Sequence, residues 1–304
     1  MAGDICLVDA SIYIFRSYFA LPDNWHSSNG ESVNAVYGYG QFLLNLMVES
    51  NSSRIVTCYD ESLGQCFRNQ IYPQYKANRA LPDENLAFQL HSCQKMAELL
   101  GVSCLVSSTY EADDLIASAA YQIKRNKTLN RRAIAIVTRD KDLGQLLTRK
   151  RDYLWNFSDR EKIYSDEFFQ KFGVHPKQLT DYLALVGDSI DNIPGVPGIG
   201  PKTAVRLLAS FGSLKGIFKE IDNIQALGFR GAKTLKPKLI EHLEQIALAK
   251  SLATVVDDID LPGFPACIDL KPINWLKLKH FCDEFGLNQI YKRAQNLLLL
   301  QSKP

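Results

Sequence analysis

The chain lacks any apolar run of the roughly 18 residues that a membrane-spanning helix requires. Its first residues, Met-Ala-Gly-Asp4, carry an acid where a secretory signal would be basic. Both absences argue against a membrane protein and against an exported one. The sequence therefore predicts a cytoplasmic protein.

The sequence also lacks the cysteine and histidine patterns that are typical of disulfides, zinc sites and covalent catalysis. The seven cysteines form no CxxC pair, and several lie inside apolar runs, as Cys6 does in the segment over 5–8. Buried free thiols are therefore expected in place of disulfides or a zinc site. The five histidines are scattered, and no Ser or Cys stands near a His at a recognisable spacing. Covalent catalysis by a protein nucleophile has no support in the sequence.

The first half of the chain instead contains a regular alternation of short apolar runs and helical patterns. Strands are expected over 5–8, 55–59, 102–106 and 133–138, and helices over 33–48, 85–100, 112–124 and 143–147. This alternation predicts an α/β fold with a central, mostly parallel sheet that helices cover on both faces. In such sheets, functional sites form beyond the carboxyl ends of the strands.

Acidic residues follow four of the expected strands. They are Asp9, Asp60, Glu111, Asp113, Asp114, Asp140 and Asp142. Each alone is better explained as a helix cap or as an acid in the first turn of a helix than as a functional residue. Together at one sheet edge they would repel one another unless a cation neutralised them. Oxygen ligands without His or Cys select Mg²⁺, with Mn²⁺ as a substitute.

Two further acids lie beyond the expected sheet. Asp188 and Asp191 are spaced i,i+3, so both can face the same way, although a turn with a helix cap explains them equally well. The turn Gly198-Ile-Gly200 follows and opens an amphipathic helix. Such a helix-hairpin-helix-like unit binds phosphate through backbone N–H groups and the helix N-terminus.

The basic residues cluster along the chain at 124–132, at 149–151 and from 202 to 238. Any one cluster alone is more typical of a solvated surface than of a binding site. The chain carries 35 lysines and arginines against 33 acids. If nine acids surround metal ions, the remaining surface is strongly positive, which suits a polyanionic partner such as nucleic acid.

The sequence resembles a known family over essentially its whole length. The matching segments are LVDASIYIFRSYFA (7–20), YPQYKANR (72–79), YEADD (110–114), VTRDKDLGQLL (137–147) and VGDSIDNIPGVPGIGPKTA (186–204). They are similar to the 5′ nuclease domain of bacterial DNA polymerase I and to the related phage and cellular flap endonucleases. Because the chain ends at Pro304, we expect neither polymerase nor proofreading activity. The resemblance also implies a monomer of the bacterial cytoplasm or nucleoid.

The resemblance implies roles for individual residues. Two Mg²⁺ ions would be held by Asp9, Asp60, Glu111, Asp113, Asp114, Asp140, Asp142, Asp188 and Asp191. The catalytic cations would be Arg16, Lys76 and Arg79. The DNA contacts would be Arg68, Tyr75, Gly198, Gly200, Lys202, Thr203 and Arg206. A K⁺ ion at the hairpin motif is a further expectation. The two divalent ions would activate the attacking water and stabilise the leaving oxygen.

The resemblance also implies a domain plan. A resolvase-like (PIN-like) nuclease core over 1–175 would include a helical arch at about 61–85, where aromatic rings stack on bases and cations follow phosphates. A helical DNA-binding region over 176–304 would contain the hairpin motif at about 186–212. Within the core, residues of the arch would lie over the acidic edge.

Two functions from different classes remain open. The first is a structure-specific 5′ nuclease, acting as exonuclease and flap endonuclease on 5′ flaps, nicked or gapped duplexes and RNA-primed ends. The second is a DNA-junction binding protein with a vestigial nuclease site. The complete set of acids favours the first, because a binding protein gains nothing from nine carboxylates that repel phosphate. An RNA-cutting nuclease is disfavoured by the hairpin motif.

Overall fold

The centre of the protein is a six-stranded sheet in the order β3-β2-β1-β4-β5-β6. It is seen in a computed structural model that describes residues 3–62, 65–229 and 231–301. All neighbouring strands are parallel except β5 and β6. The strands are β1 (Ile5–Asp9), β2 (Ile55–Asp60), β3 (Ser103–Ser107), β4 (Ile134–Val137), β5 (Tyr153–Asn156) and β6 (Glu161–Tyr164). The predicted, mostly parallel sheet is confirmed.

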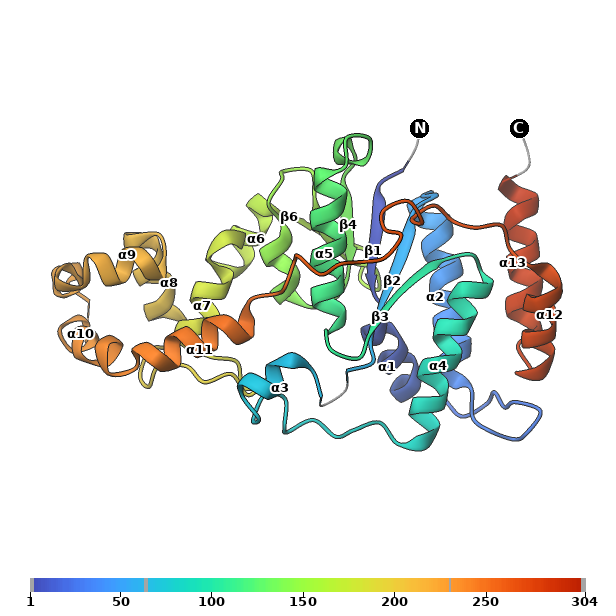
Figure 1. The fold of residues 1–304 in the computed structure, drawn as a ribbon, viewed down its shortest axis with the longest axis horizontal. Coiled ribbons are helices and arrows are strands. Elements are labelled where there is room, and N and C mark those ends of the chain that lie inside the picture. Colours follow the sequence, from blue (N-terminus) through green and yellow to red (C-terminus); the bar gives the residue numbers. More distant parts are fainter. Residues whose placement is uncertain (1–2, 63–64, 230, 302–304) are drawn as a thin grey trace.

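Helices surround the sheet and extend away from it on one side (Figure 1). The α-helices are α1 (Ala10–Ala20), α2 (Asn34–Ser50), α3 (Phe67–Ile71), α4 (Glu84–Leu99), α5 (Ala112–Arg125), α6 (Ser165–Phe172), α7 (Leu179–Val186), α8 (Pro201–Phe211), α9 (Leu214–Lys219), α10 (Ala232–Glu241), α11 (Leu243–Ala253), α12 (Trp275–Glu284) and α13 (Asn288–Gln301). Four short 3₁₀ helices are η1 (Leu129–Arg131), η2 (Lys141–Leu146), η3 (Pro176–Gln178) and η4 (Ile221–Leu227). In the described part of the chain, no helix is both long and apolar enough to cross a membrane.

The central strands are buried on both faces, which explains their nearly continuous apolar sequences. Successive side chains of a strand point to opposite faces. In β1, Leu7 belongs to one core cluster, whereas Cys6 and Val8 belong to the other. The second cluster also contains residues of α1, α2, α4, α12 and α13, so these helices cover that face.

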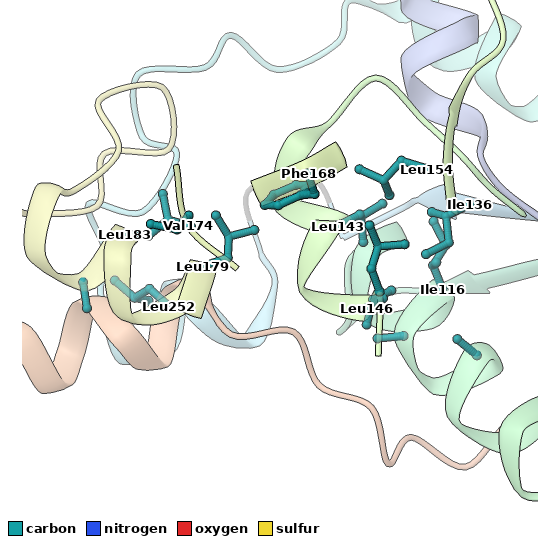
Figure 2. Packing of buried hydrophobic residues seen from close by; sticks show 14 of the residues in the cluster. Ile116, Ile136, Leu143, Leu146, Leu154, Phe168, Val174, Leu179, Leu183 and Leu252 are labelled. Atoms are coloured by element: carbon teal, nitrogen blue, oxygen red, sulfur yellow. The ribbon is translucent and has the colours of Figure 1, made fainter. Parts of the chain in front are cut away.

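The other face packs against α5 and continues into the helices beyond the sheet. Figure 2 shows this continuity: Ile116 of α5 and Ile136 of β4 lie at one end of the cluster, and Leu183 of α7 and Leu252 of α11 lie at the other. Phe168 of α6 is fully buried in this same cluster. One uninterrupted core therefore holds the helical region against the sheet and fixes the position of the loop that follows α7.

The segment expected to form a helical arch differs from the prediction. Among its described residues, 65–85, only the five residues of α3 and the start of α4 are helical, and the rest is a series of turns. Arg68 and Tyr75 of this segment are buried. The prediction of a helical arch was therefore wrong. Residues 65–85, which we call the strap, run along the edge of the molecule from α3 to the start of α4 (Figure 1).

The last part of the chain does not stay with the helical region. After α11, residues 254–274 run back along the core, where the backbone N–H of Val256 donates to Asp114 (2.8 Å) and that of Leu270 donates to Ser53 (2.7 Å). The helices α12 and α13 then pack on the face that carries α2 and α4. The expected grouping of 176–304 as one helical region thus fits only as far as α11.

Candidate active site

Carboxylates from adjacent strands meet at one edge of the sheet. Asp9 is the last residue of β1 and Asp60 the last of β2. Asp140 follows β4 and caps η2, where it accepts the backbone N–H of Asp142 at 2.7 Å. Asp113 lies in the first turn of α5, which follows β3. Because these four strands are neighbours and parallel, their carboxyl ends share one edge, as the sequence predicted.

The acids are close enough to disturb one another. Burial and the charges of Asp60 and Asp140 raise the pKa of Asp9 to about 8. Burial, then Asp140 and Asp9, raise the pKa of Asp113 well above its usual range. The pKa of Asp142 rises to about 6 through burial and the charge of Asp140. The edge is therefore a region where acidic groups are crowded and only partly compensated by lysine.

Glu111 and Asp114 behave differently because they face arginine and lysine. Arg68 donates to both oxygens of Asp114 (2.7 Å each) and to Glu111 (2.7 Å). Burial alone would raise the pKa of Glu111, but Lys76 and Arg68 lower it below its usual value. Asp114 is 0% exposed and also accepts the backbone N–H groups of Val256 and Glu111. Asp114 thus connects α5 with Arg68 and with Val256 inside the core. This structural role corrects the expectation that Asp114 is a metal ligand.

The same contacts correct two expected DNA contacts. Arg68 is 2% exposed, and its guanidinium also donates to the carbonyls of Leu252 and Thr254. Tyr75 is 4% exposed, and its hydroxyl donates to Glu111 at 3.0 Å. Neither side chain can stack on a base or reach a phosphate in this arrangement. Instead, they anchor the strap to the core.

The loop after α7 brings Asp188 and Asp191 to the same edge. Asp188 forms a backbone pair with Ile193 (2.9 and 2.7 Å), and its carboxylate accepts the N–H of Ile190 at 2.7 Å. Its charge contributes to the raised pKa of Asp142. The carboxylate of Asp191 pairs with Arg79 and lies 3.7 Å from the Lys76 ammonium. Asp188 and Asp191 therefore belong to a turn and also lie at the acidic edge, so the two explanations of these acids do not exclude each other.

Lys76 and Arg79 lie at the border of the acidic edge, as predicted. The Lys76 ammonium contacts Glu111 at 2.5 Å. A cavity of about 390 Å³ opens beside them, and the aromatic rings of Phe15 and Phe19 of α1 contribute to its wall. Sequence analysis missed these two rings, although their i,i+4 spacing places them on one side of a helix.

Arg16 lies on the other side of α1 from this cavity. It is exposed and lines an open groove of about 510 Å³ between α1 and α2, together with Arg160. Burial and the charge of Asp9 raise the pKa of the Tyr13 hydroxyl, whereas the charges of Arg139 and Arg16 lower it. Arg16 is therefore near the acidic edge. The structure thus places Arg16 near the acids but apart from Lys76 and Arg79.

The donor set at this edge fits a hard divalent cation. It offers carboxylate oxygens alone, and Oδ1 of Asp142 is buried without a hydrogen bond, although Lys141 lies 3.3 Å from it. Within residues 3–62, 65–229 and 231–301, no three His, Cys, Asp or Glu side chains are grouped closely enough to hold an ion together. Like charges at this edge favour a wider spacing, which a bound cation would reduce.

The hairpin motif forms as predicted between α7 and α8. Gly198 has a φ of 80°, a left-handed conformation that glycine adopts without strain. Gly200 caps α8, and Lys202, Thr203 and Arg206 lie in its first two turns. The ammonium of Lys238, from α10, lies 3.4 Å from the carbonyl of Pro197. Sequence analysis did not single out Lys238, whose approach depends on tertiary packing.

The raised pKa of Asp9 predicts a pH-dependent stability. The native state binds a proton there that the unfolded chain releases near pH 4, so stability falls as pH rises from about 4 to about 8. In chelator-treated protein, Asp9→Asn should therefore raise the unfolding free energy at pH 8 by about 1 to 3 kcal/mol and change it little at pH 4.5. Thermal melts at the two pH values measure the difference.

The control for this prediction is Asp152→Asn. Asp152 is equally buried, but it accepts two hydrogen bonds from Arg149, at 2.8 and 2.6 Å. Its neutralisation should lower stability at pH 8, because the arginine loses its partner. If Asp9→Asn also proves less stable than the unmodified protein at pH 8, the acidic edge is not repulsive.

The chain matches two family models in succession. Residues 4–173 match the 5′-3′ exonuclease N-terminal resolvase-like domain, and residues 174–275 match the 5′-3′ exonuclease C-terminal SAM fold. It is 35% identical to a 5′-3′ exonuclease of Buchnera aphidicola over 94% of this chain and 97% of that one. It is 37% identical to DNA polymerase I of Pseudomonas aeruginosa, over 84% of this chain but only 28% of the polymerase.

Solved structures share the fold at low sequence identity. The T5 5′-exonuclease with bound divalent metal ions (zinc) has a TM-score of 0.62 at 18% identity, over 96% of this chain and 98% of that one. The catalytic core of Rad2 in complex with DNA substrate has a TM-score of 0.65 at 16% identity, over 98% of this chain and 92% of that one. These likenesses establish a common architecture for the sheet and the helical region.

Proposed function

The chain belongs to the 5′-3′ exonuclease family, and we propose that it is a structure-specific 5′ nuclease that hydrolyses phosphodiester bonds at 5′ ends and 5′ flaps of DNA. The observation that carries this proposal is the acidic edge itself. Asp9, Asp60, Asp113 and Asp140 reach it from different elements, and burial together with the charges of neighbouring acids raises the pKa of Asp9 and of Asp113. The unfavourable energy of burying these acids beside one another is retained where the function requires their charge.

Divalent cations, Mg²⁺ or Mn²⁺, complete this site. Asp9, Asp60, Asp113 and Asp140 are the ligands proposed for the first ion, and Asp142, Asp188 and Asp191 for a second. Glu111, although paired with Lys76, remains at the border of the set. When bound, the ions supply a water of lowered pKa and stabilise the leaving oxygen. The T5 5′-exonuclease, which shares the fold, was seen with divalent metal ions.

The residues of the chain itself supply binding and orientation. Lys76 and Arg79 can approach the scissile phosphate, because each borders the acidic edge from the strap. The hairpin turn at Gly198, with Lys202 and Arg206, is suited to contacts with the phosphate backbone of a duplex, and such contacts do not depend on the base sequence. Rad2, of similar fold, was seen with a DNA substrate. We place the duplex along α8 and the 5′ end near Lys76.

The test uses three labelled DNA substrates, namely a 5′-flap duplex, a nicked duplex and a duplex with an RNA-primed end. We expect cleavage of at least one of them with Mg²⁺ and none with EDTA. A covalently closed circular duplex, which has no 5′ end, is the matched control. Binding of the flap without cleavage under either condition would contradict the nuclease and favour a junction-binding protein.

A further inference from the structure

Lys76 has an unfavourable backbone conformation. Its φ of 52° lies in the left-handed region, which residues with a β-carbon rarely adopt. Its N–H donates to the carbonyl of Asp191 at 3.0 Å. Since the side chain of Lys76 borders the acidic edge, this conformation determines where the ammonium lies. Other contacts must hold the turn in place.

Two asparagines supply those contacts. The side-chain amide of Asn192 donates to the carbonyl of Gln74 at 2.7 Å, and that of Asn78 donates to the carbonyl of Ser189 at 3.2 Å. The two hydrogen bonds run in opposite directions between residues 74–79 and the loop over 188–192. We call this pair of contacts the clip.

The loop is the rigid side of the clip. Its two ends are tied by the backbone pair of Asp188 and Ile193, and the N–H of Val196 donates to the carbonyl of Leu185 in α7 at 2.8 Å. A β-carbon at Gly195 would lie only 2.1 Å from the carbonyl of Val186, which shows how closely the loop returns to the helix. The loop therefore moves with the buried helix α7.

The strap is the less constrained side. The buried ring of Tyr75 and the hydrogen bond from Asn69 to its carbonyl (2.8 Å) hold it before Lys76. Beyond Lys76, residues 77–81 are exposed. The side chains of Lys76 and Arg79 contact the loop through charge pairs to Asp191, which a phosphate would draw apart, so that only the backbone hydrogen bond of Lys76 would remain of their own contacts. The hydrogen bonds of the two asparagines are neutral and persist when DNA binds.

We propose that Asn192 and Asn78 are positioning residues of the nuclease, which fix the turn of Lys76 against the loop so that Lys76 and Arg79 are already oriented when DNA arrives. The inference rests on the proposed function. It requires no contact between either asparagine and the substrate. A preorganised cation stabilises the transition state more than a mobile one, because no reorganisation is needed during the reaction.

The test compares Asn192→Gly and Asn78→Ala with the unmodified protein. Asn192 has a φ of 56°, so glycine keeps its backbone conformation and removes only the amide. Each variant should lose about tenfold in single-turnover rate on a 5′-flap duplex, with the dissociation constant within threefold and an unchanged melting temperature. Asn296→Ala, an exposed asparagine of α13, is the matched control and should behave as the unmodified protein.

A second measurement separates positioning from a general structural role. In a background that carries both Lys76→Ala and Arg79→Ala, Asn192→Gly should cost less than twofold, because the two cations that it positions are gone. A further tenfold loss in that background would overturn the proposal, as would full rates in both single variants. If the unmodified protein cleaves none of the 5′-ended substrates, the proposed function is overturned as well. If the unmodified protein is active and the clip variants cleave at the same rate, only the role of the clip is overturned.

Discussion

Asp113→Asn is expected to lower the single-turnover cleavage rate by about 10³-fold or more while the affinity for a 5′-flap duplex stays within a few-fold. Asp113 is buried among other acids: burial, then the charges of Asp140, Asp9 and Asp60, raise its pKa. Its loss removes charge from the centre of the proposed metal site. It also relieves repulsion toward phosphate, so DNA binding need not weaken. Pre-steady-state cleavage and fluorescence anisotropy measure the two quantities.

The adjacent residue provides the control. Asp114 faces Arg68 in the core, and Asp114→Asn should destabilise the protein by about 3 kcal/mol by leaving a buried guanidinium partly unpaired. Asp113→Asn should leave the melting temperature of chelator-treated protein equal or higher. Retention of more than about a tenth of the cleavage rate in Asp113→Asn would remove Asp113 from the ligand set.

The acidic edge could be predicted from the sequence because it depends on local patterns. Each acid directly follows a short apolar run, and the topology of parallel strands brings such positions to one edge. Asp9, Asp60 and Asp140 were located in this way without knowledge of any contact. The hairpin around Gly198 was predictable for the same reason, since its glycines and the following helix are adjacent in the chain.

The burial of Arg68 could not be predicted in this way. Its partners include the carbonyl of Leu252, which lies 184 positions away in the chain. A basic residue beside aromatic ones is equally typical of a DNA-binding strap and of a buried ion pair. Only the return of residues 254–274 along the core decides between them. The same return distinguishes Asp114 from Asp113, although the two are neighbours in the sequence.

The antiparallel edge of the sheet was also missed. β5 (YLWN) and β6 (EKIY) are as short as β4 (IAIV), but they lack the continuous aliphatic run by which β4 is recognised. Aromatic residues fill much of β5, where Tyr153 and Trp155 are buried and Lys162 of β6 lies over both rings. The position of α12 and α13 depends on packing against α2 and α4, which no local pattern encodes.

Lys76→Ala and Arg79→Ala should each reduce turnover more than affinity. Phosphoryl transfer moves negative charge onto the leaving and equatorial oxygens, and a cation fixed beside them stabilises the transition state more than the bound substrate. Both cations border the acidic edge through Glu111 and Asp191. We expect losses of about 10²-fold or more in the single-turnover rate, equivalent to about 2.7 kcal/mol. The dissociation constant should rise only a few-fold.

Lys202→Ala is the contrasting variant for this prediction. Lys202 is exposed at the start of α8, remote in sequence from the strap, and should contact only the backbone of the duplex. Its loss should weaken binding equally for all sequences, reduce the salt dependence by about one phosphate contact and leave the saturated rate intact. If Lys76→Ala and Arg79→Ala instead share this behaviour, the strap only guides the strand, and the reaction depends on the acidic edge and its ions alone.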